Sequence, residues 1–317
     1  MSMGDAARPT VAIDEQLLMA EVARRYFWEG RTRVQIATEF GLSRFKVARL
    51  IEAALRTGIV RIEIAMPQAV DAELSVKLRE RYGLDRALVT TTAGTSPEVI
   101  RDALGAAAAR LLGDLVGEGD VLGVTSGRTI DATVRHLTSL AGCEIVQLTG
   151  MSGNLDENSV EVLRRVAAVS GGAAHSMYAP LTVSTPEAAA ALRADPRVRQ
   201  AYARFGDVTI ALVAVGCWSP ADSRFHDEVS DAHRSELLAR GVIADVGGAL
   251  IDAAGRPVTD FDDRVLGLTV DQLAAIDQVI VVGGGERKAP AILATLRAGI
   301  VNTLITDGGV ARYLLAD

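Results

Sequence analysis

The pattern of apolar and polar residues predicts helices at the start of the chain. Apolar side chains recur every three to four positions in three short stretches, Ile13–Trp28, Thr32–Phe40 and Ser43–Gly58. Thr32 and Ser43 are residue types that cap helix N-termini, and Gly41 is one that ends a helix. The pattern therefore predicts three helices joined by short turns, and the second and third have the spacing of a helix-turn-helix.

The third predicted helix has an apolar stripe and an opposite basic side. The stripe recurs at i, i+3, i+4 and i+7 and comprises Val47, Leu50, Ile51 and Ala54. The opposite side carries three cations and an aromatic ring near the end that enters the major groove in this motif, namely Arg44, Phe45, Lys46 and Arg49. Cations donate to guanine edges or phosphates, and an apolar ring contacts thymine methyl groups. The alternative is a plain three-helix bundle with a solvated basic face.

An alternating run, Ile59–Ile64, follows the third helix and predicts a strand that packs beside the helices as a wing. Arg61 lies on the polar side of this run, where it can reach a phosphate. Arg33, near the start of the second helix, is a further candidate DNA contact. A proline and a glutamine then mark a linker. We therefore predict a winged helix-turn-helix domain in residues 1–66 and a second domain in residues 67–317.

Strands and helices alternate along the second domain. We predict strands at residues 86–91, 120–124, 144–148, 208–215, 278–282 and 303–305. We predict helices at residues 71–82, 96–115, 127–137, 158–170, 286–297 and 308–315. Val208–Val215 and Gln278–Val282 are continuous apolar runs, which are typical of parallel strands buried on both faces. The alternation predicts a mostly parallel, Rossmann-like α/β domain.

Four of the predicted strands end in loops rich in glycine, Gly123–Thr129, Leu148–Asn154, Val281–Lys288 and Ile305–Gly309. Ligands of open α/β sheets bind outside the carboxyl ends of the strands. Because four such loops occur in one domain, we predict a ligand site there, although glycine in any single loop also serves a tight turn. The third loop lacks the spacing of a dinucleotide motif and no Walker A pattern occurs, so we expect no cofactor.

Two cations and one carboxylate are the chemically distinctive groups near these loops. Lys288 is one of three lysines beside thirty arginines, and it follows three glycines at a predicted helix start. We interpret Lys288 and Arg128 as contacts for an anionic group, with a chance surface lysine as the alternative. Asp245 precedes two glycines and is a candidate acceptor for ligand hydroxyls. The histidines show no zinc or triad spacing, and we place His226 and His233 in solvated loops.

Charge is distributed unevenly along the 317 residues. The net charge is −7 and the isoelectric point is about 5.3, which for the whole chain argues against nucleic-acid binding. Between Arg24 and Arg61, however, nine basic residues oppose three glutamates, a local charge of +6, so the remainder carries −13. A small basic segment joined to a large acidic one indicates a division of labour, although arginines also coat ordinary helices.

The composition indicates a globular protein. Hydrophobic residues make up 49% of the chain and charged residues 23%, which excludes wholesale disorder. The apolar stretch near Ile210–Trp218 is shorter than the ~20 residues of a membrane span, and residues 1–10 lack the apolar segment of a signal peptide. We therefore expect a cytoplasmic protein with no membrane partner. Cys143 and Cys217 lack neighbouring cysteines or histidines at ligand spacing, so we expect neither a disulfide framework nor a metal site.

On ten motifs taken together, the sequence resembles the SorC family of bacterial sugar-responsive transcriptional regulators. The motifs are YFWEG (Tyr26–Gly30), QIA (Gln35–Ala37), GLSRFKVARLI (Gly41–Ile51), GIVRIEI (Gly58–Ile64), LGVTSGRTI (Leu122–Ile130), VQLTG (Val146–Gly150), APL (Ala179–Leu181), ADVGGALIDAAG (Ala244–Gly255), GGGERKAPAILATLRAG (Gly283–Gly299) and LITDGGVARYLL (Leu304–Leu315). The resemblance implies a sugar-isomerase-like effector domain after the winged helix-turn-helix. It also implies a homo-oligomer, a tetramer or a dimer, in which a small sugar, polyol or sugar phosphate controls the binding of operator DNA.

The loops and the resemblance together give the candidate effector contacts, Gly123, Thr125, Ser126, Gly127, Arg128, Thr129, Thr149, Gly150, Asp245, Gly284, Gly285, Glu286 and Lys288. Three positions depart from the family pattern. Ser126 stands where the family commonly has tryptophan, Met151 where it has a second glycine, and Ala244 where a glycine often precedes the acid. These differences concern the effector's identity rather than the location of the pocket.

We predict a transcriptional regulator that is not an enzyme. The alternative is a sugar-phosphate isomerase or aldolase-like enzyme with an accessory helix-turn-helix, in which Lys288 forms a Schiff base with an aldehyde. In a third interpretation, the basic helices mediate protein contacts only.

Overall fold

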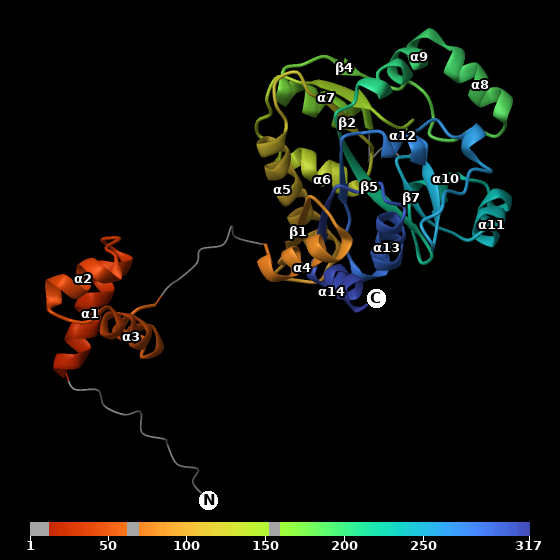
Figure 1. Cartoon of the computed structure of the whole chain (residues 1–317). Helices are drawn as coiled ribbons and strands as arrows, with labels where there is room; N and C mark the ends of the chain where they lie inside the picture. Colours follow the sequence, from red (N-terminus) through yellow and green to blue (C-terminus); the bar gives the residue numbers. More distant parts are fainter. Residues whose placement is uncertain (1–12, 62–69, 152–158) are drawn as a thin grey trace, which may run out of the picture. The chain divides into compact units, whose positions relative to one another are not determined.

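The computed structural model describes residues 13–61, 70–151 and 159–317 of the chain. These residues form two compact units that divide between residues 66 and 67, and each is described by itself (Figure 1). No helix of the described residues is long and apolar enough to cross a bilayer.

The N-terminal unit is the predicted set of three helices, α1 (Ile13–Phe27), α2 (Arg33–Phe40) and α3 (Arg44–Arg56). The Thr32 hydroxyl caps α2 in a capping box with Gln35, and Gly41 ends α2 with a φ of +62°. The four stripe residues of α3 are all buried, as predicted. They pack with Met19, Val22 and Ile36 into the core of this unit. The predicted helical region is therefore confirmed.

The predicted wing strand is not formed in the part of it that the structure describes. Residues 59–61 follow α3 without strand structure, and residues 62–64 lie outside the described residues, as do Pro67 and Gln68 of the predicted linker. A strand needs a neighbouring strand to pair its backbone groups. The described residues of this unit form no strand that supplies one, so the wing stays a prediction.

The C-terminal unit is built on a parallel sheet with the strand order β1-β10-β9-β5-β2-β3-β4. The strands are β1 (Arg86–Thr90), β2 (Val121–Val124), β3 (Glu144–Gln147), β4 (Ala174–His175), β5 (Ile210–Trp218), β9 (Gln278–Val282) and β10 (Thr303–Asp307). The principal helices are α4 (Ala72–Tyr82), α5 (Pro97–Leu115), α6 (Arg128–His136), α7 (Ser159–Ser170), α13 (Ala289–Arg297) and α14 (Gly308–Ala316). The predicted parallel α/β architecture is confirmed.

Alternate residues of each central strand enter different hydrophobic cores. Ala211 and Val213 of β5 pack in a core with residues of α4, α13 and α14. Ile210 and Leu212 of the same strand pack in a second core with residues of α5, α6 and α7. Since successive strand side chains point to opposite faces, the sheet is covered by helices on both faces (Figure 1).

An antiparallel extension at the end of β5 was not predicted, apart from an apolar strand at Gly241–Ala244. It contains β6 (Ala221–Asp222), β7 (Val242–Val246) and β8 (Ala249–Asp252), with β6 and β7 both paired to β5. The helices missed by the pattern are α8 (Pro186–Ala194), α9 (Pro196–Ala203), α10 (Arg224–Glu228), α11 (Asp231–Ala239) and α12 (Val270–Ala274). A third core around Trp218, Phe225 and Phe261 supports this extension.

Three sequence predictions need correction here. His226 and His233 lie in α10 and α11 rather than in solvated loops, because Ser223 and Ser230 cap these short helices. The apolar run Gly241–Ala244 predicts a strand that ends before Asp245, but Asp245 lies within β7. The helix predicted to begin at Glu286 begins at Ala289, after a 3₁₀ turn.

Candidate ligand pocket and nucleic-acid interface

A cavity of about 920 Å³ opens at the carboxyl ends of the parallel strands. Loops that follow β1, β2, β3, β9 and β10 contribute to its lining, together with the end of β5 and the antiparallel extension. Its size lies within the range of small-molecule sites. The structure brings eleven sequence candidates together here, namely Thr125, Ser126, Gly127, Arg128, Thr129, Thr149, Asp245, Gly284, Gly285, Glu286 and Lys288.

Two candidate glycines, Gly123 and Gly150, do not line this cavity. A Cβ at Gly123 would lie 2.7 Å from a methyl carbon of Leu148. A Cβ at Gly150 would lie 2.3 Å from the carbonyl oxygen of Pro180. Close packing within the fold therefore explains both glycines, and neither of these two predicted contacts lies in the cavity.

Other lining residues were missed by the sequence analysis. They are the β1–α5 loop (Thr90–Thr95), Arg101, the segment Asp222–Phe225, the start of α14 (Asp307–Gly309) and Arg312. Asp307 lies in the predicted glycine loop Ile305–Gly309, which is the signal that could have found it. Nothing in the local sequence marked Asp222, since its charged partners come from distant segments.

One end of the cavity contains two cations that share a carboxylate. Arg128 forms an ion pair with Asp222. The Lys288 ammonium lies 3.4 Å from the other oxygen of Asp222 and donates to the carbonyl oxygen of Val215 at 2.9 Å. Burial alone would raise the pKa of Asp222, but the charges of Lys288 and Arg128 outweigh burial and lower it. The carboxylate is therefore firmly ionised and held by both cations.

A third cation, Arg224, lines the same cavity. Burial and the charge of Arg128 together lower the pKa of Arg224 to about 10, while Glu228 opposes the change. Crowding of positive charge at this end favours an anionic ligand group.

The other chemically distinctive group of the cavity is Asp245. Its side chain is enclosed within the domain but keeps a partly accessible surface, and it lines the cavity. The Trp218 indole donates to Asp245 Oδ1 at 2.8 Å, and the Ser223 hydroxyl donates to the same oxygen. Burial raises the pKa of Asp245, although these two hydrogen bonds oppose the change. Gly216 leaves room for this carboxylate, because a Cβ there would lie 2.2 Å from Oδ1.

Asp307 organises two of the glycine loops at the remaining side of the cavity. Its carboxylate accepts from the backbone N–H groups of Gly285, Gly309 and Val310. The first free amides of α14 are therefore satisfied by the chain's own carboxylate. A Cβ at Gly284 would lie 2.6 Å from this carboxylate, which explains the glycine there.

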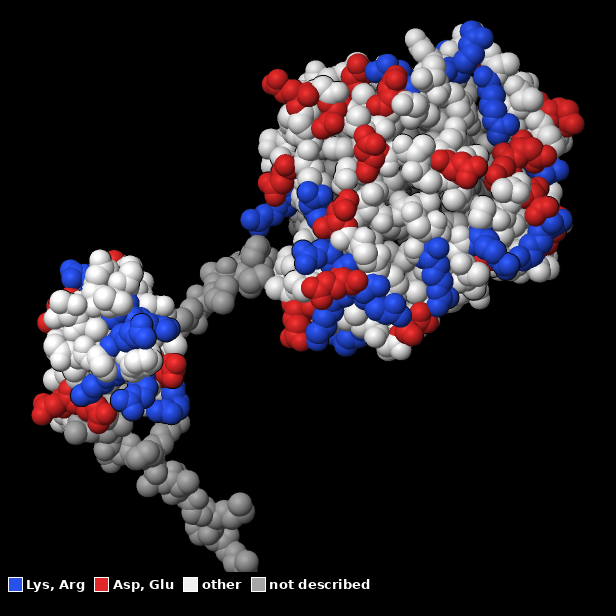
Figure 2. Space-filling view, viewed as in Figure 1, with Lys and Arg blue, Asp and Glu red and all other residues white. Residues whose placement is uncertain are grey.

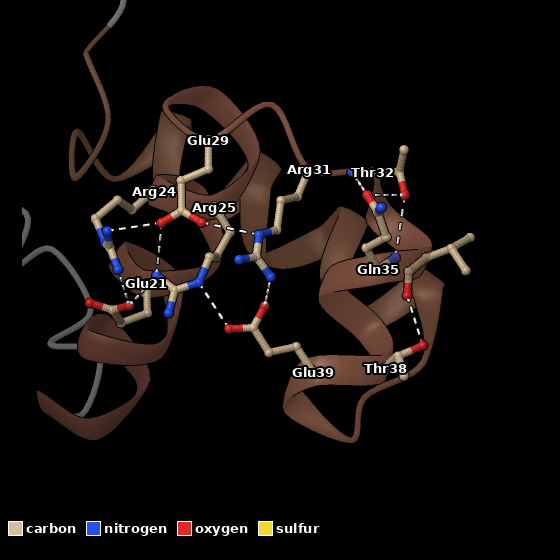
Figure 3. Close-up of polar contacts among 10 residues, drawn as sticks. Glu21, Arg24, Arg25, Glu29, Arg31, Thr32, Gln35, Thr38 and Glu39 are labelled. Carbon is tan, nitrogen blue, oxygen red and sulfur yellow. Dashed lines mark hydrogen bonds and ion pairs between the residues drawn. The ribbon is translucent and has the colours of Figure 1, made fainter.

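The basic residues of the N-terminal unit fall into two groups. Arg24, Arg25 and Arg31 are held in a network with Glu21, Glu29 and Glu39 (Figure 3). The second group is exposed and has no acidic partner within the described residues, and it comprises Arg33, Arg44, Lys46, Arg49, Arg56 and Arg61.

The N-terminal end of α3 presents an aromatic ring beside these unpaired cations. Phe45 is 68% exposed, and the Arg44 guanidinium lies 4.8 Å from the centre of its ring. In the face seen in Figure 2, Lys and Arg side chains gather on part of the N-terminal unit, which also shows some acidic groups, and the two signs are mixed over the C-terminal unit. Unpaired cations around an exposed ring are suited to contact DNA phosphates and base edges.

Comparison with known proteins identifies the family. Residues 67–316 match a family model described as "Putative sugar-binding domain". The chain belongs to the SorC/DeoR-type family of sugar-binding transcriptional regulators. It is 30% identical over 311 residues to the transcriptional regulator LsrR of Enterobacter sp. (strain 638), with 96% of this chain and 95% of that protein covered.

A second relative and a solved structure extend the family comparison. LsrR of Klebsiella pneumoniae is 31% identical over 311 residues and has the same coverage of both chains. The crystal structure of the full-length sorbitol operon regulator SorC from Klebsiella pneumoniae matches with a TM-score of 0.72 at 24% identity. It covers 95% of this chain and 99% of that one, which shows a common fold.

This SorC/DeoR-type regulator is a transcriptional regulator with a sugar-binding domain. Its relatives are regulators, so the prediction that the chain is not an enzyme is confirmed. In the cavity the Lys288 amine is bound to a carbonyl oxygen and a carboxylate. These contacts suit a charged ammonium rather than the neutral amine that a Schiff base requires.

Proposed function

We propose that this regulator binds operator DNA through residues 1–66 and a small sugar, polyol or sugar phosphate through residues 67–317. The observation that carries the proposal is a cavity at the strand ends with cations at one end and a part-buried carboxylate elsewhere. A sugar phosphate offers an anion to the first and hydroxyl groups to the second. The family match over this part of the chain supports a sugar ligand.

Arg128 and Lys288 are the proposed contacts for the phosphate, since both already bind a carboxylate in the cavity. Asp245 is the proposed acceptor for a ligand hydroxyl, and the hydroxyl groups of Thr125, Ser126 and Thr129 line the same space. Thr149, the loop glycines 127, 284 and 285, and Glu286 complete the proposed contact set.

Arg44, Phe45, Lys46 and Arg49 are proposed to read the operator in the major groove. Arg33 and Arg61 are proposed to contact phosphates. The exposure of all six, and the lack of acidic partners for the cations among the described residues, support this assignment.

Effector control requires two states of the protein that bind DNA with different affinity, and a ligand shifts their balance only by its differential affinity for them. We place these states in arrangements of a homo-oligomer, a tetramer or dimer, in the cytoplasm.

A thermal-shift screen of sugars, polyols and their phosphates tests the effector half, because a ligand that binds the folded state raises the unfolding midpoint. Phosphorylated compounds are expected to raise it most. The hits are then added to a complex with a duplex selected by the protein from a random library, and fluorescence anisotropy follows release or tightening. Stabilisation only by unphosphorylated polyols would reject Arg128 and Lys288 as phosphate contacts.

A further inference from the structure

Two consecutive residues of the antiparallel extension satisfy two proposed ligand contacts at once. Asp222 binds Arg128 and Lys288, and the adjoining Ser223 donates its hydroxyl to Asp245. The Asp222 carboxylate thus occupies the place proposed for the ligand's anionic group. The Ser223 hydroxyl occupies the place proposed for a ligand hydroxyl. Both groups are supplied by one short segment that lines the cavity.

We propose that the Asp222–Ser223 segment is a built-in competitor of the effector, which an anionic ligand bearing a hydroxyl group displaces from the cavity. The inference rests on the proposed function and names the ligand class more narrowly. The ligand carries a phosphate or similar dianion, and a neutral polyol does not complete the exchange.

The exchange follows from charge. A phosphate monoester carries about −1.5 to −2 charges at pH 7 and offers three acceptor oxygens, whereas Asp222 carries one charge. Three cations line this end of the cavity, so the more highly charged group is favoured there. The Asp222 side chain is already 34% exposed, so its return to water requires little rearrangement. A neutral polyol replaces Ser223 alone and leaves Asp222 on both cations.

Displacement of the Asp222–Ser223 segment would also affect residues outside the cavity, because Ser223 contacts them. Its hydroxyl also accepts from the backbone N–H of His226 at 3.2 Å and so caps α10. Phe225 of α10 stacks edge-on against Trp218, with ring centres 5.7 Å apart. The Trp218 indole in turn binds Asp245. Loss of Ser223 from Asp245 therefore changes the surroundings of a buried tryptophan.

Titration calorimetry with inorganic phosphate tests the competition on the full chain. In Asp222→Asn the competing charge is gone, so we expect phosphate to bind at least tenfold more tightly than to the wild type. Asp227→Asn is the matched control, because Asp227 is 75% exposed on α10 and pairs only with His226 in the described residues. The control should bind phosphate as the wild type does.

Unchanged or weaker phosphate binding by Asp222→Asn would overturn the inference, since Asp222 would then organise the cations rather than compete for them. If the wild type binds phosphate in that case, the proposed function survives. If neither protein binds phosphate or any phosphorylated sugar, the inference fails, and the proposed function then depends on whether the thermal-shift screen finds an unphosphorylated sugar or polyol.

Trp218 fluorescence gives a second measurement that leaves Asp222 in place. The chain has two tryptophans, and Trp28 is 88% exposed in the N-terminal unit, so Trp28→Phe leaves Trp218 as the sole reporter. Saturating phosphate is expected to shift its emission, whereas saturation without any change in emission would contradict displacement of the segment.

Discussion

The cations of the N-terminal surface differ from those of the C-terminal cavity in what surrounds them. Arg44, Lys46 and Arg49 are exposed, and no carboxylate of the described chain holds them. Arg128 and Lys288 share Asp222, and Lys288 is 16% exposed. An exposed cation is stabilised by water, whereas a cation removed from water needs an anionic or polar partner. Burial therefore explains the pairing of Lys288 but not that of Arg128, whose side chain is 42% exposed.

The largest effect is expected from removing a paired cavity cation. Lys288→Ala should weaken binding of a phosphorylated ligand about 10–100-fold, because a hydrogen bond to a charged group contributes about 1.5–3 kcal/mol. Titration calorimetry measures the change. Lys77→Ala is the control, since Lys77 pairs with Glu73 on the surface of α4. Equal losses in the two variants would remove Lys288 from the site.

The next effect compares an unpaired with a paired arginine in the N-terminal unit. Arg49→Ala should weaken operator binding about tenfold, since a base or phosphate contact contributes about 1–3 kcal/mol. Arg24→Ala should change it far less, because Arg24 is held by Glu21 and Glu29. Anisotropy titrations at several salt concentrations separate base from phosphate contacts. A loss at Arg24 as large as that at Arg49 would break the distinction between the two groups.

A carboxylate whose burial outweighs a nearby cation gives a smaller, pH-dependent effect. Burial and the charges of Asp263 and Asp260 together raise the pKa of Asp262 to about 6, while Arg193 opposes the rise. The pKa in the folded state thus exceeds that in the unfolded state. The resulting stabilisation is complete below about pH 4 and is lost as the pH rises through 6.

Asp262→Asn is therefore expected to raise the unfolding midpoint at pH 7.5 and to change it little at pH 4.5. Thermal unfolding at the two pH values measures this, with the exposed Asp277→Asn as the control. A variant whose midpoint follows the wild type in parallel across this range would contradict the raised pKa of Asp262.

The smallest effect is expected from the exposed ion-pair network. Glu39→Gln removes the pairs with Arg25 and Arg31, which are 2.9 and 2.8 Å long. Exposed pairs contribute little, so the unfolding midpoint should fall by at most about 2 °C. Operator affinity should rise slightly because Arg25 and Arg31 each lose one acidic partner and keep Glu29. A fall in operator affinity with the fold intact would show that the network positions α3, the helix proposed to contact the operator.

Local periodicity was sufficient for the helices of the N-terminal unit and for the central parallel strands. The burial of the α3 stripe and of the run Gln278–Val282 can be predicted from the apolar pattern of each segment alone. The antiparallel extension carries no such pattern, because its apolar residues belong to a core assembled from Leu181 to Val265. Apart from the predicted strand at Gly241–Ala244, its strands and short helices therefore became visible only in the fold.

The same distinction applies to the candidate site. Glycine loops located the cavity, because parallel strands bring their carboxyl ends to one edge. The sequence did not show that Leu148 fills the space beside Gly123, nor that Asp222 pairs with Arg128 from 94 positions away. Contacts over such separations depend on tertiary structure. Only these contacts show whether a glycine serves packing, as Gly123 does, or lines the cavity.

The occupation of the α14 amides by Asp307 has a consequence for how effector preference changes during evolution. With those backbone donors already taken, recognition at that side falls to exchangeable side chains such as Arg101 and Arg312. Substitution of a few of these positions can retune the ligand while the sheet and its helices stay intact. The cavity thus provides a constant frame whose selectivity can diverge between relatives without loss of the fold.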